Sequence, residues 1–324
     1  MSDEMNSAEP SVSVVIPVYN GASTIRRAVE SVLAQDYQNI EIIVVNDGST
    51  DATLEALGQF ESKIRVLCQE RQGPPIARIN GSHAGAGKFV AFLDADDQWL
   101  PRKLSLTVDA LVHNSDAVLS YSNVIPVNYS GLPTGELYVT PDVAKAPTME
   151  DLLRQLWPIL PSSAVVLRST FNRCAEPYSK FNTRGYEDCF LWLLVREHGC
   201  FCYVPEPLVI YQQPPLLNRL KKYRKGFDLF VSLVAERYGP AGCNLIEEAH
   251  RSYASMLGYL GLMALAAGDR RQAQDYLKRA LQFDALRVRN FLRLIRAYLP
   301  RVIAIPLTGR TRSAYLHQEL PSEH

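Results

Sequence analysis

The chain has 324 residues, enough for one large domain or two modest domains with a substantial buried core. Apolar residues make up 47% of it and charged residues 21%, which is ordinary for a soluble globular protein. The formal net charge is zero, which argues against a general nucleic-acid binder. The first ten residues are polar and acidic and show no secretory signal. The longest uncharged apolar stretch, residues 253–268, is shorter than the roughly 20 residues of a membrane-spanning helix, so we expect a packed helix there.

Strand-like and helix-like segments alternate through the first third of the chain. Short β-branched or apolar runs predict strands, and apolar residues at helical spacing predict helices. In chain order we expect strands at residues 11–17, 40–45, 64–68 and 89–93, and helices at residues 25–33, about 52–60 and 74–86. The connecting loops are short enough for right-handed crossovers. This alternation therefore predicts an α/β fold with a doubly wound, mostly parallel sheet and helices on both faces.

Polar residues follow three of these predicted strands, at Tyr19-Asn20, Asn46-Asp47 and residues 94–97. The carboxyl ends of parallel strands meet at one edge of a sheet, so these loops are expected to line a single crevice. The sequence has neither the GxGxxG fingerprint of dinucleotide binders nor the GxxxxGK[ST] phosphate loop. A nucleotide bound there would therefore depend on carboxylates and a metal ion.

Three carboxylates, Asp94, Asp96 and Asp97, follow the strand at residues 89–93 within four positions. Like charges this close repel, so the cluster indicates a bound cation or extensive hydrogen bonding. Carboxylate oxygens suit Mg²⁺ or Mn²⁺, and Mg²⁺ usually sits between one or two carboxylates and substrate phosphates. The alternative is a solvated turn in which Asp97 caps the next helix.

The middle of the chain is less regular. We expect a helix after Pro101, strands at residues 117–121, 136–140, 163–167, 200–204 and 208–211, and a short helix at residues 149–157. Glu187 and Asp188 begin an amphipathic helix with a tryptophan on it. Two acids at a helix N-terminus are favourable through the helix dipole alone, so a purely structural role for this pair stays open.

The last third reads as helical from about residue 223. Residues 255–266 and 271–283 are expected to form a helix hairpin with the spacing of a single tetratricopeptide unit. One such unit cannot bury its apolar face alone, so it would pack on the preceding α/β domain, on a second copy of the chain or on another protein. Residues 290–299 are basic and apolar, a pattern that fits either an anionic membrane surface or a helix with its arginines in solvent.

Six cysteines show no CxxC pair and no histidine at zinc-ligand spacing. We expect all six to be buried free thiols without a catalytic role. They are Cys68, Cys174, Cys189, Cys200, Cys202 and Cys243.

Two stretches resemble a known family. They are VSVVIPVYNGASTIRRAVESVLAQDYQNIEIIVVNDGSTDAT and ARINGSHAGAGKFVAFLDADD. Together they resemble the nucleotide-sugar-binding half of the family 2 glycosyltransferases, which have the GT-A fold, and the match covers residues 11–104 closely. The resemblance implies an inverting transfer of a sugar from a nucleotide-sugar donor, most often UDP-linked, to a saccharide or lipid-linked acceptor hydroxyl in cell-surface polysaccharide or glycolipid synthesis.

The resemblance also assigns roles to residues on the donor side. It implies that Asp47 holds the nucleotide base, that Arg78 lies near the diphosphate and that Asp94-Ala95-Asp96 is the DxD motif. Asp96 would coordinate the divalent cation, Mg²⁺ or Mn²⁺. The loop that would pack around the base consists of Pro17, Val18 and Tyr19.

On the acceptor side, the family carries an acidic pair where Glu187 and Asp188 stand. Asp188 would be the base that deprotonates the acceptor hydroxyl, and Glu187 would orient the acceptor or the helix start. The pattern departs from the family further on, because Gln212 stands where an arginine is usual and Pro214 where a histidine metal ligand is usual. This departure leaves the strength of metal binding open.

Together with this resemblance, the sequence suggests how the chain divides into domains. We expect a disordered N-terminus at residues 1–10, a GT-A domain at 11–218, a helical region at 219–305 and a flexible tail at 306–324. The nucleotide-sugar half of the domain would end at residue 104, and the acceptor half would cover residues 105–218. The protein is expected to be cytoplasmic, with contact at the inner face of the cell membrane and self-association through the C-terminal helices as further expectations.

Two other functions stay in view. A nucleotidyltransferase that makes sugar nucleotides shares the sheet order and paired acids, but its first strand is followed by a glycine-rich loop with arginine or lysine, which residues 18–21 are not. The other is a degenerate, non-catalytic transferase domain that acts as a scaffold through its helical tail. The departure at Gln212 and Pro214 favours the scaffold, and the presence of Asp94, Asp96 and Asp188 opposes it.

Overall fold

The structure is a computed structural model, and it describes residues 11–128, 130–133, 147–154, 159–183, 185–213, 216–266 and 268–283. Contacts between Cα atoms divide the chain into two compact units, residues 1–148 with 157–230 and residues 149–156 with 231–324. Four expectations lie outside the described residues: the strand at 136–140, the basic helix at 290–299, the N-terminal segment 1–10 and the tail 306–324. The domain boundaries given above stay predictions.

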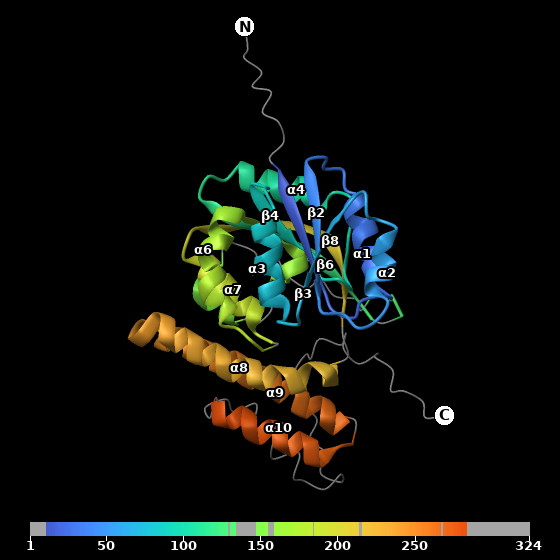
Figure 1. The fold of residues 1–324 in the computed structure, drawn as a ribbon. Helices are drawn as coiled ribbons and strands as arrows, with labels where there is room; N and C mark the ends of the chain where they lie inside the picture. The colour runs from blue at the N-terminus through green and yellow to red at the C-terminus, as the bar shows by residue number, and fades with distance from the viewer. Residues whose placement is uncertain are drawn as a thin grey trace, which may run out of the picture. The chain divides into compact units, whose positions relative to one another are not determined.

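The first unit contains an eight-stranded sheet in the order β3-β2-β1-β4-β7-β6-β8-β5. Its first part follows the predicted alternation: β1 Val12–Val18, α1 Ile25–Leu33, β2 Ile40–Asp47, α2 Thr53–Gly58, β3 Arg65–Gln69, α3 Pro74–Ala84 and β4 Phe89–Phe92 (Figure 1). The pairs β1/β2, β1/β4, β2/β3 and β6/β8 are parallel. The pairs β4/β7, β6/β7 and β5/β8 are antiparallel. The mostly parallel sheet predicted from the sequence is confirmed.

The later part of this unit departs from the prediction in four places, the first of which is the unpredicted short strand β5. Its elements are β5 Gln98–Trp99, α4 Lys103–Val112, β6 Ala117–Val127, a 3₁₀ turn at Pro161–Ser163, β7 Ala164–Leu167, α6 Arg168–Ser179, α7 Glu187–Arg196 and β8 Cys200–Gln212. The two strands expected at 200–204 and 208–211 are one continuous strand, β8, which pairs along β6 with register shifts. Strand β6 runs on to Val127, beyond the predicted end at residue 121. Helix α6 was not predicted.

The second unit is helical where it is described. It holds α5 Met149–Arg154, a 3₁₀ turn at Gly239–Gly242, α9 Cys243–Ala266 and α10 Arg270–Phe283, and α8 Leu216–Tyr238 runs from the first unit into it. The predicted hairpin is confirmed: α9 and α10 meet at Gly268, whose φ is +83°, and Gly261 faces Leu277. Among the described helices, none combines the length and the apolar character that crossing a membrane requires.

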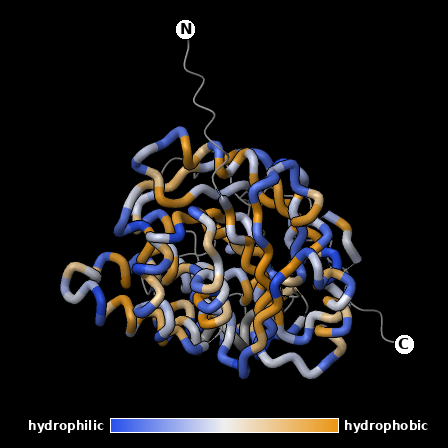
Figure 2. Tube along the Cα trace, turned by 45° about the horizontal axis from the view of Figure 1, so that its top comes forward, coloured by the Kyte–Doolittle hydropathy of each residue, from blue (hydrophilic) through white to orange (hydrophobic). Residues whose placement is uncertain are grey.

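The core of the sheet consists of the apolar strands. Side chains on β1, β2 and β4 such as Val14, Ile16, Val44 and Ala91 are fully buried, as expected for strands covered on both faces. Figure 2 shows hydrophobic stretches, drawn in orange, running through the middle of the molecule among hydrophilic segments drawn in blue. All six cysteines are free, but only Cys174 and Cys189 are buried. The expectation of six buried thiols is wrong for Cys68 and Cys243, which are exposed, and for Cys200 and Cys202, which are half-buried.

Helix α3 approaches the sheet closely at Gly81. A Cβ atom at this position would lie 2.3 Å from Cγ1 of Val15 and 3.1 Å from Cγ2 of Val45. We expect Gly81→Ala to lower the free energy of unfolding by about 1–3 kcal/mol, because the added methyl group overpacks the contact between helix and sheet. The measurement is urea unfolding, with Gly58→Ala as the control, since a Cβ at Gly58 meets only Glu61 Oε1 at 4.0 Å. Equal stability of the two variants would contradict this packing argument.

Helix α4 begins with a buried lysine. Lys103 is fully buried, and its Nζ donates to the carbonyl oxygen of Ala164 at 3.3 Å and lies 4.0 Å from the ring centroid of Trp99. Burial lowers the pKa of Lys103 well below its ordinary value of 10.5. In the window between the two pKa values the unfolded chain binds this proton and the folded chain does not, so stability rises with pH there.

We expect Lys103→Met to remove this pH dependence, because methionine keeps the apolar stem and carries no titrating group. At pH 7 the variant should be more stable than the original chain, because methionine avoids the cost of burying an ammonium group or of removing its proton. The measurement is the free energy of unfolding between pH 6 and pH 10, with the exposed Lys63→Met as the control. An unchanged slope with pH would contradict the expectation.

Candidate functional site

The loops after β1 and β2 are tied together. Asn20, in the left-handed region with φ +53°, donates its backbone N–H to Ser49 Oγ at 2.9 Å, and its Oδ1 accepts from the N–H of Thr50 at 2.8 Å. In the predicted base-binding loop, Val18 is buried, and Pro17 and Tyr19 are both half-buried. The structure therefore brings two of the three predicted loops into direct contact.

Asp47 ends β2 and holds the loop that leads into α3. Its side chain is buried, and its Oδ1 accepts from Gln69 Nε2 at 2.8 Å and from the N–H of Gln72 at 2.7 Å. Its Oδ2 accepts from the N–H of Gly73 at 2.9 Å. A carboxylate has about four acceptor positions, so this arrangement leaves one for a ligand. Its role in holding the nucleotide base stays a prediction.

Arg71 is a site residue that the sequence did not reveal. Its guanidinium carbon lies 3.9 Å above the ring centroid of Tyr19. The same loop borders a pocket of about 320 Å³, whose lining comes from the segments 71–75 and 181–183. Nothing in the spacing of Arg71 pointed to this contact, because it depends on how Asp47 folds the loop after β3.

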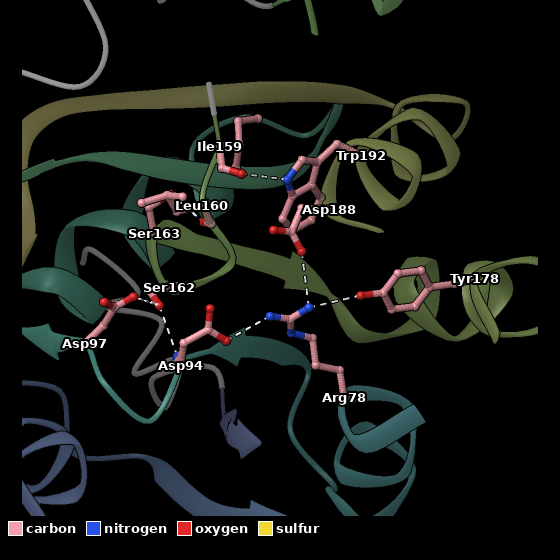
Figure 3. A network of polar contacts seen from close by, with 10 residues as sticks. All are labelled: Arg78, Asp94, Asp97, Ile159, Leu160, Ser162, Ser163, Tyr178, Asp188 and Trp192. Atoms are coloured by element: carbon pink, nitrogen blue, oxygen red, sulfur yellow. Dashed lines mark hydrogen bonds and ion pairs between the residues drawn. The ribbon is translucent and has the colours of Figure 1, made fainter. Parts of the chain in front are cut away.

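Arg78 joins the donor side and the acceptor side of the site (Figure 3). Its Nη2 lies 2.8 Å from Asp94 Oδ1, and its Nη1 lies 3.2 Å from Asp188 Oδ1. Nη1 also donates to the hydroxyl of Tyr178 at 3.1 Å. The arginine side chain is only 3% exposed, whereas the two carboxylates are 36% and 32% exposed. Three predicted site residues from α3, the end of β4 and the start of α7 thus form one charged cluster.

Burial and the positive charge of Arg78 shift the pKa values of Glu187 and Asp188, the acidic pair of α7, in opposite directions. Burial raises the pKa of Asp188 well above its ordinary value, and the positive charge of Arg78 acts against that shift. Burial also raises the pKa of Glu187, opposed by Arg78 and by the N–H of Gly185, which donates to Glu187 Oε2 at 2.5 Å. A carboxylate whose pKa is shifted towards neutrality is suited to accepting a proton.

The turn before α7 aims this acidic pair. Gly185 has φ +94° and Tyr186 has φ +69°, so two consecutive residues take the left-handed region. For a tyrosine this conformation costs about 1–2 kcal/mol, and it persists where the surrounding packing enforces it. The Tyr186 ring packs against Phe227 and Phe230, with ring centroids 5.2 and 5.8 Å away. This aromatic packing fixes the direction in which Glu187 and Asp188 leave the turn.

The three carboxylates after β4 have different environments. Asp97 is buried, and its oxygens accept from Ser162 Oγ at 2.5 Å and from the N–H of Gln212 at 2.9 Å. Ser162 Oγ also accepts from the N–H of Asp94 at 3.0 Å. Burial, with the charges of Asp96 and Asp94, raises the pKa of Asp97. The alternative in which Asp97 caps a helix is wrong, because strand β5 follows it and its carboxylate joins the 3₁₀ turn to the end of β8.

The surroundings of Asp96 show what kind of metal site this residue could form. Asp96 is exposed at the tip of the turn, and Ala95 beside it is half-buried against the core. Within the described ranges, no group of three or more histidine, cysteine, aspartate or glutamate side chains is placed to hold a metal ion. A single exposed carboxylate fits a Mg²⁺ or Mn²⁺ ion that takes its remaining ligands from substrate phosphates and water.

Gln212, where the family usually has arginine, does not supply a charge to the site. Its Nε2 donates to the carbonyl oxygen of Asn128 at 2.8 Å, and it is 9% exposed. Pro214 lies outside the described residues. The end of β8 therefore adds no positive charge, and the buried cation that contacts Asp94 and Asp188 is Arg78.

Comparison with known proteins places this site in a family. Residues 13–155 match the family described as Glycosyl transferase family 2. A putative teichuronic acid biosynthesis glycosyltransferase, TuaG of Bacillus subtilis, is 30% identical over 204 residues, which cover 61% of this chain and 77% of that protein. The chain belongs to glycosyltransferase family 2. The uncharacterized glycosyltransferase RP339 of Rickettsia prowazekii is 41% identical over 231 residues, 70% of this chain and 59% of that protein.

The chain matches only part of the length of some family 2 relatives. Its match to an uncharacterized glycosyltransferase of Rickettsia felis covers 30% of that protein. Solved structures share its fold. S. aureus TarS, residues 1–349, aligns with a TM-score of 0.59 and 16% identity over 89% of each chain. The mannosyltransferase PcManGT of Pyrobaculum calidifontis aligns with a TM-score of 0.53 and 17% identity over 90% of this chain and 86% of that one. The GT-A-like fold expected from the sequence is confirmed.

Proposed function

We propose that this family 2 chain is an inverting, hexosyltransferase-type glycosyltransferase that moves a sugar from a UDP-linked donor to an acceptor hydroxyl. The observation that carries the proposal is the cluster in which Arg78 contacts both Asp94 and Asp188. In this cluster, the proposed donor-side carboxylate, Asp94, contacts Nη2 of the guanidinium, and the candidate base, Asp188, contacts Nη1. The reaction needs these two functions side by side.

On the donor side, the nucleotide base would lie against the loop of Pro17, Val18 and Tyr19, with Asp47 offering its remaining acceptor position. Asp94 and Ala95 would face the sugar nucleotide, and Arg78 would lie near the diphosphate. A divalent cation at Asp96, Mg²⁺ or Mn²⁺, would neutralise charge on the departing diphosphate. Two fold relatives support this assignment: TarS has been solved with UDP-GlcNAc, and PcManGT with GDP-Man and Mn²⁺.

On the acceptor side, Asp188 would take the proton of the attacking hydroxyl. The hydroxyl oxygen forms the new bond to the anomeric carbon while the bond from that carbon to the diphosphate oxygen breaks, which inverts the configuration. The proton ends on the carboxylate of Asp188, and the nucleoside diphosphate leaves with the bonding electrons. The raised pKa of Asp188 favours this proton transfer near neutral pH. Glu187, fixed by Gly185, would hold the start of α7 and orient the acceptor.

The acceptor is proposed to be a saccharide or a lipid-linked saccharide of a cell-surface polymer, and the similarity to TuaG, a putative teichuronic acid biosynthesis glycosyltransferase, supports this. A cytoplasmic location with contact at the inner face of the membrane is part of the same proposal. The basic helix at residues 290–299, which suggested that contact, lies outside the described residues. Self-association through the C-terminal helices stays a prediction.

The experiment is a panel of nucleotide sugars incubated with the chain and Mn²⁺, with release of nucleoside diphosphate measured before and after adding candidate acceptors. The proposal predicts slow release from one uridine-linked sugar without acceptor and faster release with one. Absence of both binding and release for every donor would favour the scaffold alternative, in which the helical tail carries the function.

A further inference from the structure

Tyr178 lies in the charged cluster although no sequence pattern indicated it. It stands on α6, is fully buried, and its hydroxyl accepts a hydrogen bond from Arg78 Nη1 at 3.1 Å (Figure 3). Its ring packs edge-on against Phe171 with centroids 6.2 Å apart. Burial raises the pKa of Tyr178 above its ordinary value, so the hydroxyl stays neutral and keeps its proton at physiological pH.

The contacts of Arg78 explain why this hydroxyl matters. Nη1 is shared between Asp188 and Tyr178, Nη2 contacts Asp94, and Nε is buried with no hydrogen-bond partner in the described part of the chain. Because Nε is not anchored, the plane of the guanidinium depends on the partners of its two terminal nitrogens. Both carboxylates are about one-third exposed and can turn towards water or a ligand. Tyr178 is the partner that is fully buried.

We propose that Tyr178 is a positioning residue for sugar transfer, which fixes the guanidinium of Arg78 so that it faces Asp94 and Asp188 at the same time. This inference rests on the proposed function. The tyrosine touches neither the donor nor the acceptor in this account, and it acts through Arg78 alone. When a donor diphosphate attracts the guanidinium, the buried hydroxyl keeps Nη1 beside the base.

The kinetic test is Tyr178→Phe, which removes one hydroxyl and keeps the ring packed on Phe171. The matched control is Tyr121→Phe, since the buried Tyr121 hydroxyl has no hydrogen-bond partner in the described part of the chain. We expect Tyr178→Phe to lower kcat about tenfold, which is the scale of one hydrogen bond to a charged group, with the KM for donor changed less than twofold. Tyr121→Phe should leave kcat unchanged. A loss of thermal stability in Tyr178→Phe with unchanged kcat would overturn the proposal and leave a structural role.

A second readout does not depend on activity. The Nε–H resonance of Arg78, assigned by its absence in Arg78→Lys, should be narrow and slowly exchanging in the original chain and in Tyr121→Phe. In Tyr178→Phe it should broaden or exchange with solvent at least tenfold faster, because the guanidinium is no longer held. An unchanged resonance would overturn the proposal. If no nucleotide sugar is ever consumed by the original chain, the proposed function fails, and this spectrum still decides whether Tyr178 holds Arg78.

Discussion

Replacing Asp188 with asparagine is expected to lower kcat for sugar transfer by about a hundredfold or more and to leave donor affinity within about threefold. A hundredfold loss of kcat corresponds to the typical contribution of a positioned general base. Donor affinity survives because Asp188 contacts Arg78 Nη1, whereas the donor-side contact of Arg78 is made by Nη2 with Asp94. The measurement is steady-state transfer, together with calorimetry of the nucleoside diphosphate.

The control for this variant is Asp109→Asn on α4. Asp109 is an exposed carboxylate that pairs with the exposed His113, so its removal changes the net charge equally without touching the site. Transfer by the control should equal that of the original chain. If Asp188→Asn retained more than half of kcat, another group would have to accept the proton, and the account of the acceptor side would be wrong.

Replacing Asp96 with asparagine is expected to reduce turnover and Mn²⁺-dependent donor affinity together, each by at least about a hundredfold. Asp96 is exposed at the tip of the turn after β4, and an amide oxygen is a neutral and weaker ligand for a hard divalent cation. Binding of the donor without metal should change little, since Asp47 and the loop after β1 are untouched. The measurement is donor affinity with and without Mn²⁺ in both proteins.

The two variants separate the two roles. Asp188→Asn should lose turnover with affinity retained, and Asp96→Asn should lose both when Mn²⁺ is present. Equal losses of donor affinity in the two variants would contradict the division between a metal residue and a base. An unchanged Mn²⁺ dependence in Asp96→Asn would place the cation on another residue.

The first half of the fold followed from local signals. Strands β1, β2 and β4 are short apolar runs with polar residues at or just after their carboxyl ends. Their order along the chain therefore predicts the sheet and the edge at which Asp47 and Asp94 lie. The acidic pair of α7 was also visible in the sequence as Glu187 and Asp188. The sequence did not show that Arg78 would contact both Asp94 and Asp188. This contact joins α3, the end of β4 and α7, and it depends on how these elements pack.

The parts that sequence did not predict depend on residues far apart in the chain. Tyr178 lies 100 positions from Arg78, and it stands on α6, a helix that is rich in polar residues and contains Pro177. Asp97 reaches Gln212 across 115 positions and turns into the core instead of capping a helix. Helix propensity and hydrophobic spacing are local quantities, so neither contact could be read from them.

The most direct test of the central claim is calorimetric titration of the original chain with UDP, with and without Mn²⁺. The account predicts binding that strengthens at least about tenfold when Mn²⁺ is present, because Asp96 would hold a cation that neutralises the charge of the diphosphate. Binding that is equally strong without metal would contradict the role of Asp96. Absence of binding under both conditions would contradict the donor site itself and would favour a non-catalytic scaffold built on a family 2 fold.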